Sequence, residues 1–388
     1  MRPATIRLHF SDGTSISAWT RLEQRDKFTE PLSTLRLDVA PSADRFKEYR
    51  SKLAKGQVLS LLVDDKPQFA GFVQTCTTRV DPKDGATISI EAFNPLKLLY
   101  ESTVDIPAMS KILNADGPII DLVSQALAPY HIDVGGDADL ALIKSRTGKN
   151  TRATATPTAE LKFKEAQAQP NESTIVFLNR MLTRLGVLLR YDAGSSLVYI
   201  TAPHYAGDPI GTLKMCATGT GPNGVRFFGA IEEVDSNEGQ FSFCETTGAT
   251  TDSAGDTQSS APKARALTAD INSRRPPFRS ADGLDYKPCF HRDTNCRDKN
   301  RALSVSKLVL GLRAEEAYQI RGACDSLLSE DGTPWTVDTL ARVFVPKLEL
   351  DEVMWISERT FSADASGGQQ TALTLIPKGN LVLGDLPS

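Results

Sequence analysis

Two adjacent acidic residues, Glu232 and Glu233, are the first candidates for chemistry in this sequence. Most glycoside hydrolases place two carboxyl groups on either side of the scissile bond, so a glycan-cleaving site is one hypothesis for this region. The surrounding residues predict a strand, however, and neighbouring side chains of a strand point to opposite faces. The pair can therefore give at most one carboxylate to any one site, and an exposed structural role is the alternative.

Cys289, His291 and Cys296 form a cluster of side chains of the types that bind metals. Their spacing matches no standard zinc motif, and the sequence offers no evident fourth ligand. We therefore predict no metal and leave the role of these three residues open. The remaining cysteines are scattered, and without an export signal we expect them to be reduced thiols, mostly in buried positions: Cys76, Cys216, Cys244 and Cys324.

Glycine-rich segments also give no cofactor site. Gly219, Gly221 and Gly224 have the spacing of a dinucleotide fingerprint, but the residues that follow predict a strand instead of the helix that such a site needs. Gly148 and Lys149 lack the other residues of a phosphate-binding loop. No serine nucleophile elbow occurs, and the four histidines lack a triad pattern. We predict no catalytic residue, no cofactor and no enzymatic activity.

The composition is that of an ordinary globular protein, and its 388 residues predict two to four domains. Acidic residues outnumber basic ones by 48 to 44, and the net charge of −4 argues against stable binding of nucleic acid phosphates. The sequence contains no run of about 18 apolar residues and begins without a secretory signal. We therefore expect synthesis and folding in the cytoplasm, without a membrane partner.

A pattern of alternating apolar and polar residues occurs near both ends of the chain. Each copy predicts three antiparallel strands followed by a proline and then by leucines, at Pro95 and Pro377. The repetition predicts two similar antiparallel β-barrels, the first of them a barrel or a half-open sandwich. The strands are expected at residues 57–63, 68–75 and 86–92 in the first copy and at residues 339–345, 353–361 and 371–376 in the second.

Between the two copies the apolar residues recur with helical spacing. They predict helices near residues 119–127, 173–184 and 292–316, with a hairpin at 187–201 and polar loops at 139–158 and 246–260. The fold class is therefore mainly β with an α+β insertion. We predict an N-terminal barrel at 1–100, an α+β domain at 101–209, a mixed strand and loop region with the long helix at 210–330, and strands that complete the second barrel at 331–388.

The order of these parts resembles the baseplate hub proteins of contractile-tailed bacteriophages, the Mu-like and late control D group. The similar stretches are Phe69-Ala70-Gly71-Phe72-Val73 with the segment 91–99 after it, the helix and hairpin at 173–201, and the strands at 355–361 and 373–375 that follow Trp335. Together these stretches extend over most of the chain.

The resemblance implies a structural hub in the tail baseplate of a virion, assembled in the host cytoplasm. It implies a homotrimer that forms a pseudo-six-fold ring, joins the hexameric tail tube to a trimeric spike and lets DNA pass. The expected partners are two further copies, a separate spike protein, the tail tube or a tube-initiator hexamer, and other baseplate proteins. A tail-associated enzyme that cleaves peptidoglycan or glycan, resting on Glu232 and Glu233, is the alternative, and a glycan- or nucleic-acid-binding barrel is a third hypothesis.

Overall fold

The structure is a computed structural model of the chain. It describes residues 3–16, 19–81, 85–107, 109, 117–135, 162–163, 168–183, 187–203, 205, 207–215, 222–236, 238, 240–248, 262–267, 286–293, 296, 299–365 and 368–379. Within these residues, none of the helices combines the length and the apolar character that crossing a membrane requires.

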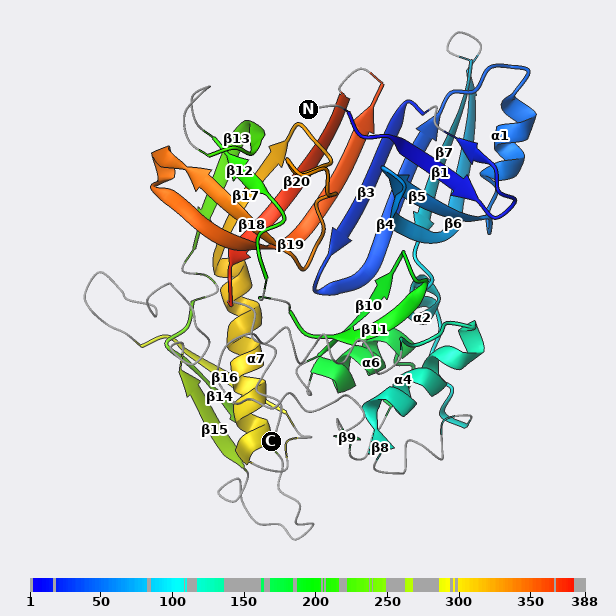
Figure 1. The fold of residues 1–388 in the computed structure, drawn as a ribbon. Coiled ribbons are helices and arrows are strands. Elements are labelled where there is room, and N and C mark those ends of the chain that lie inside the picture. Colours follow the sequence, from blue (N-terminus) through cyan, green and yellow to red (C-terminus); the bar gives the residue numbers. More distant parts are fainter. Residues whose placement is uncertain are drawn as a thin grey trace.

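One large sheet dominates the molecule and forms its upper part in Figure 1. The sheet contains thirteen strands among the described residues, in the order β18-β12-β13-β17-β20-β19-β3-β4-β7-β6-β5-β1-β2. Its strands are β1 (Ile6–Phe10), β2 (Ser15–Ile16), β3 (Arg21–Lys27), β4 (Glu30–Val39), β5 (Val58–Val63), β6 (Lys66–Asp81), β7 (Gly85–Phe93), β12 (Thr212–Lys214), β13 (Val225–Asp235), β17 (Tyr318–Cys324), β18 (Leu340–Val345), β19 (Leu350–Asp364) and β20 (Gly368–Pro377).

The second half of this sheet closes into a six-stranded barrel. An additional pairing of β18 with β19 completes the circle β18-β12-β13-β17-β20-β19. The short strand β12 lies parallel to both β13 and β18, and the other pairs in the circle are antiparallel. We call these six strands the C-terminal set. Three of the six strands, β12, β13 and β17, come from residues 210–330.

The first half of the sheet repeats the same strand order. We call β1, β5, β6, β7, β4 and β3 the N-terminal set. When the six strands of each set are numbered along the chain, their order across the sheet is 1-4-5-6-3-2 in both sets. This shared order confirms the repeat predicted from the sequence. In the N-terminal set, however, β1 is antiparallel to β5, and β3 pairs with β19 of the other set. The N-terminal set is thus the half-open form of the two that the sequence allowed.

A single hydrophobic core fills both sets. Alternating residues are buried in strands such as β1 and β5, where β5 has Leu59, Leu61 and Val63 inside. The same core continues through Val343 and Leu375 of the C-terminal set. Because one core serves both sets, burial of apolar surface favours their folding as one unit. Helix α1 (Phe46–Lys52) packs against this core through Phe46 and Tyr49.

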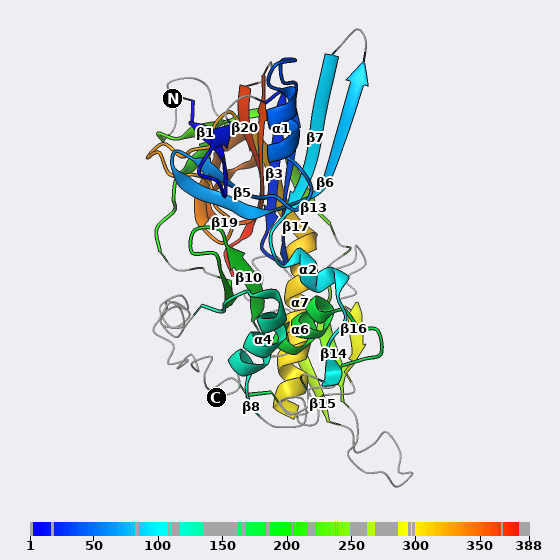
Figure 2. The same ribbon diagram turned by 90° about the vertical axis from the view of Figure 1, so that its right-hand side faces the viewer.

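A smaller α+β module lies below the N-terminal set in Figures 1 and 2 and has its own core. The buried face of α4 (Ile119–Leu127) is the one that the sequence predicts, and α6 (Thr174–Thr183) and the hairpin of β10 (Leu188–Asp192) and β11 (Leu197–Thr201) pack against it. The remaining described elements here are α2 (Lys97–Glu101), η1 (Ala128–Tyr130), β8 (Gly117–Pro118) and β9 (Lys162–Phe163).

The second insertion consists of a long helix and a three-stranded sheet. Helix α7 (Lys299–Ala317) packs along the sheet of β15 (Lys263–Leu267), β14 (Phe243–Thr247) and β16 (Pro288–Arg292), and runs directly into β17. Figure 1 shows α7 below the barrel that it enters. The insertion thus hangs from the C-terminal set.

Several predicted boundaries differ from the structure. The long helix begins at residue 299, not 292, because residues 288–292 pair with β14 instead. Strand β19 begins at residue 350, not 353, because the turn before it is formed by η3 (Pro346–Leu348) and ends at Glu349 with a left-handed φ of 52°. Residues 246–247 belong to β14, whereas the loop at 139–158 and residues 249–260 of the second loop lie outside the described residues.

Candidate assembly surfaces

Glu232 and Glu233 lie on β13, where each faces a partner on the neighbouring strand β17. The Glu232 carboxylate lies 3.7 Å from the Arg321 guanidinium, and both side chains are about half exposed or more. Glu233 Oε1 accepts a hydrogen bond of 3.0 Å from the Tyr318 hydroxyl. The structure therefore gives these acids cross-strand partners, and it does not bring the two carboxylates together as a pair.

The cysteine and histidine cluster is split between two places. Cys289 lies directly opposite Cys244 in the parallel pair of β14 and β16. Cys296 is buried beside Ala302, and its thiol donates a hydrogen bond of 3.5 Å to the Asp293 carboxylate. Burial, with the neighbouring thiol of Cys289, raises the pKa of Cys244 to about 12. Among the described residues, no three His, Cys, Asp or Glu side chains are grouped closely enough to hold a metal ion.

The sequence did not reveal the Cys244–Cys289 pairing because only strand register brings these residues together. The other glycine and cysteine candidates cannot be placed in the same way. Gly148, Lys149, Cys216, Gly219 and Gly221 lie outside the described residues. Gly224 is described, and it precedes β13 in extended chain, as the sequence predicted.

A buried arginine joins the two strand sets. Arg359 of β19 is 1% exposed, and its guanidinium donates to Gln68 Oε1 at 2.7 Å and to Gln24 Oε1 at 2.9 Å. The same group donates to the main-chain oxygen of Trp335 at 2.7 Å and lies 3.8 Å from Asp26. Burial lowers the pKa of Arg359 to about 10, so the side chain stays charged near neutral pH. The network therefore fixes strands β3, β6 and β19 relative to one another.

The hairpin of β6 and β7 extends beyond the rest of the sheet (Figure 2). Strand β5 pairs with β6 only as far as Phe72, and β4 pairs with β7 only from Ile88 onward. Residues 75–81 therefore have β7 as their strand neighbour among the described residues, and Val80 is 71% exposed. An unpaired strand edge of this length can accept a strand from another protein.

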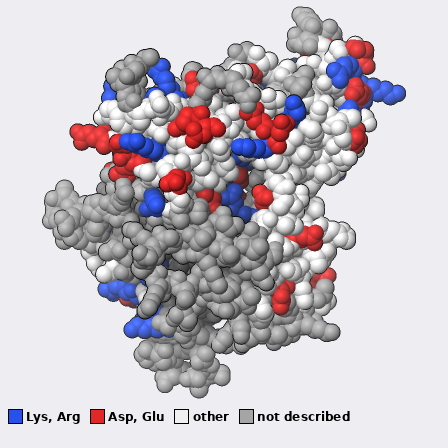
Figure 3. Space-filling view, viewed as in Figure 1, with Lys and Arg blue, Asp and Glu red and all other residues white. Residues whose placement is uncertain are grey.

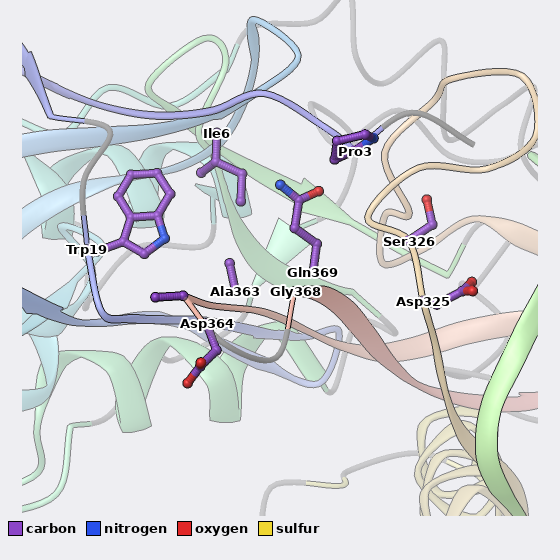
Figure 4. Close-up of a pocket in the computed structure, with 10 residues that line it drawn as sticks. Pro3, Ile6, Trp19, Asp325, Ser326, Ala363, Asp364, Gly368 and Gln369 are labelled. Atoms are coloured by element: carbon purple, nitrogen blue, oxygen red, sulfur yellow. The ribbon is translucent and has the colours of Figure 1, made fainter.

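A cleft of about 500 Å³ lies where the first strand meets the last hairpin (Figure 4). The Gln369 side chain bonds both the main-chain N–H and the main-chain oxygen of Ala4, at 2.8 and 2.7 Å, and so replaces a strand neighbour there. Trp19 and Ile6 give the cleft an apolar wall, and Asp325 lies on its opposite side. The described lining also includes the polar side chains of Ser326 and Asp364.

Charged side chains on the sheet surface are mixed in sign. Figure 3 shows acidic and basic residues interspersed over the described upper part of the molecule. One example is the pair of Arg342 and Asp351, whose side chains lie 2.8 Å apart. The Arg342 guanidinium holds the pKa of the Asp351 carboxyl below its usual value. This face offers no single-sign field that would attract a polyanion.

The fold is shared with solved tail proteins. The 43 kDa tail protein of prophage MuSo2 from Shewanella oneidensis matches with a TM-score of 0.71 and 16% identity, over 97% of this chain and 99% of that chain. A tail protein from Neisseria meningitidis matches with a TM-score of 0.71 and 13% identity, over 99% of both chains. The prophage tail protein gp18 from Listeria monocytogenes matches with a TM-score of 0.52 and 9% identity, over 95% of this chain and 94% of that chain.

No protein-family model matches the sequence, and no curated protein matches it either. The likeness to the solved structures therefore rests on shape, because the identities are low. It extends over nearly the whole chain in each of the three structures. The chain has the fold of phage tail proteins, which confirms at the level of fold the resemblance drawn from its sequence.

Proposed function

We propose that this chain is the structural hub of a contractile phage tail baseplate. Three copies form a ring in which N-terminal and C-terminal sets alternate, so that six similar strand sets face the six-fold tail tube. The observation that carries the proposal is the shared strand order of the two sets within one chain. Threefold symmetry of such a chain supplies six similar surfaces without requiring six copies.

The half-open form of the N-terminal set supports a ring contact at its free edge. Residues 75–81 of β6 have an unpaired edge, and such edges are protected in native proteins by pairing or by cover. A neighbouring copy in the ring would supply this cover. The cleft beside Trp19 lies between the two sets, because Ile6 of β1 and Gln369 of β20 both line it, and it suits a side chain of the spike or of another baseplate protein.

The proposal places the protein in the virion tail, with a separate trimeric spike and the tail tube or a tube-initiator hexamer as neighbours. It assigns no catalytic residue. The mixed surface charges also fit a ring that lets DNA pass without holding it, because a polyanion is bound tightly only by clustered cations.

Light scattering combined with negative-stain microscopy tests the ring. We expect a particle of about three times the chain mass of 42.1 kDa, seen as a ring with six lobes. Replacement of the exposed edge residue Val80 with lysine should lower the trimer fraction without changing the melting temperature of the monomer. Val58→Lys, at a valine that is 55% exposed on β5, is the matched control.

Two results would contradict the proposal. One is a chain that stays monomeric both alone and when mixed with purified spike protein and tail tubes. The other is a ring whose symmetry is not threefold. If Val80→Lys and Val58→Lys weaken the trimer equally, the ring contact lies elsewhere than the hairpin edge.

A further inference from the structure

A second, larger cleft lies where helix α7 meets the barrel. Its volume is about 790 Å³, which is within the range of pockets that hold small ligands. It lies between α7, the turn after β3 and strands β16, β17, β19 and β20. Val309 and Leu312 of α7 give it an apolar wall, and Glu315 lines it from the last turn of the helix.

Glu315 is a buried carboxylate without a partner. Its residue is 6% exposed, and among the described contacts no group donates a hydrogen bond to its carboxylate and no cation pairs with it. The hydrogen bond from Gln319 goes to its main-chain oxygen instead. A buried charge is costly unless it is paired, so the ionised form of Glu315 destabilises the folded chain.

The groups around Glu315 increase this cost. Glu316, Glu358 and Glu30 all raise its pKa, although each of the three is paired with a cation of its own. The last turn of a helix also carries a negative partial charge, which disfavours a carboxylate there. Burial is the largest cause, and together these effects raise the pKa of Glu315 to about 7.

The cations near the cleft are already engaged. Lys27 lowers the pKa of Glu315, but its ammonium group lies 3.2 Å from Glu30. Arg313 lies 3.6 Å from Glu316, and Arg321 lies 3.7 Å from Glu232. His291 of β16 also lines the cleft. Because each of these cations already has a carboxylate partner, an ionised Glu315 leaves one net negative charge around the cleft.

We propose that this cleft binds an alkylammonium group, with the Glu315 carboxylate as its counter-ion and the α7 wall of Val309 and Leu312 against its apolar stem. Two sources carry this chemistry, a free aliphatic amine and a lysine side chain of a neighbouring protein in the assembled tail. A metal ion held by three or more protein ligands does not fit, because the described residues bring no three suitable side chains together.

Calorimetric titration of the purified full chain with n-butylammonium chloride tests the free-amine source. Above the pKa of Glu315 we expect saturable binding that equal sodium chloride does not reproduce, and weaker binding as the carboxylate is protonated at lower pH. Glu315→Gln should lower the affinity at least tenfold. Glu48→Gln removes the same charge from a side chain on α1 that is 43% exposed and lies outside the cleft, and it should leave the affinity within about twofold.

Zero-length carbodiimide cross-linking of assembled particles, read by mass spectrometry, tests the lysine source. A cross-link from Glu315 to a lysine of another chain assigns the cleft to a partner side chain. The proposal is overturned if butylammonium binds no better than sodium and no such cross-link forms, or if Glu315→Gln binds butylammonium as well as the unchanged chain. The titration uses the isolated chain, so its result does not depend on whether the ring forms.

Discussion

The N-terminal and C-terminal sets have the same strand order but different closure. In the C-terminal set, the three-residue strand β12 bridges β13 and β18 and completes the barrel. In the N-terminal set, the corresponding strand β1 pairs with β5, and β3 pairs with β19 of the other set. One copy of the repeat thus satisfies its own strand edges, and the other uses an edge to join the two copies.

The two sets also differ in the link between their second and third strands. In the N-terminal set, β3 ends at Lys27 and β4 begins at Glu30, so the link is a tight turn. In the C-terminal set, β13 ends at Asp235 and β17 begins at Tyr318, and this link holds the small sheet and α7. The closed copy carries the insertion, whereas the open copy keeps unpaired edges. Closure and the free strand edge are thus divided between the two copies.

Loss of the buried arginine that joins the two sets should have the largest effect on stability. Arg359→Met leaves Gln24, Gln68 and the Trp335 oxygen without their hydrogen-bond donor. We expect this substitution to lower the free energy of unfolding by about 3–5 kcal/mol. Urea denaturation monitored by tryptophan fluorescence measures this. Arg25→Met, at an arginine that is 46% exposed on β3, is the control and should cost about 1 kcal/mol or less. Equal losses would show that Arg359 does not join the sets.

The insertion should respond to pH through Glu315. The folded-state pKa of about 7 is above the ordinary value of 4.5, so the folded chain binds the proton more tightly, and stability falls as the pH rises through this window. Above it, Glu315→Gln should be more stable than the unchanged chain by up to about 3 kcal/mol. Below about pH 4 the two should unfold alike. Thermal unfolding across this range measures the difference, and a constant difference would contradict it.

Opening the barrel is a direct way to make the two sets alike. A Cβ atom added at Gly224 would lie 2.5 Å from the Thr212 oxygen, so Gly224→Ala should push β12 away from β13 at a cost of about 1–3 kcal/mol. Hydrogen exchange should show faster exchange at the amide of Leu213. Asn223→Ala, at the exposed residue before it, should change neither quantity. Unchanged protection in Gly224→Ala would mean that this close approach does not maintain the closure.

The sequence predicted the repeated strand triplets because burial of one face imposes a period of two on each strand. Leu59, Leu61 and Val63 make this pattern visible without any knowledge of the fold. It also predicted the buried face of α4, where apolar residues recur at helical spacing. Local patterns of this kind depend only on neighbours along the chain.

Contacts between distant residues were not predictable in this way. Arg359 meets Gln68 across 291 residues, and Cys244 meets Cys289 only through strand register. The polar Gln68 and Gln24 gave no signal that they would accept bonds from a buried guanidinium. The three-residue strand β12 was too short to show a period of its own, so its role in closing the barrel was also hidden. Closure of the barrel and the joint between the two sets both depend on contacts between residues far apart in the sequence.

Surface ion pairs should matter least to the comparison. Arg36 of β4 lies opposite Glu91 of β7, with its guanidinium 2.9 Å from the carboxylate, but its side chain is 67% exposed. Water screens such a pair, so Arg36→Ala should lower the free energy of unfolding by only about 0.2–1 kcal/mol, and high salt should remove most of this difference. Urea denaturation at low and high salt measures both values. A loss as large as that of Arg359→Met would mean that surface charge, and not the shared core and the buried joint, holds the open set in place.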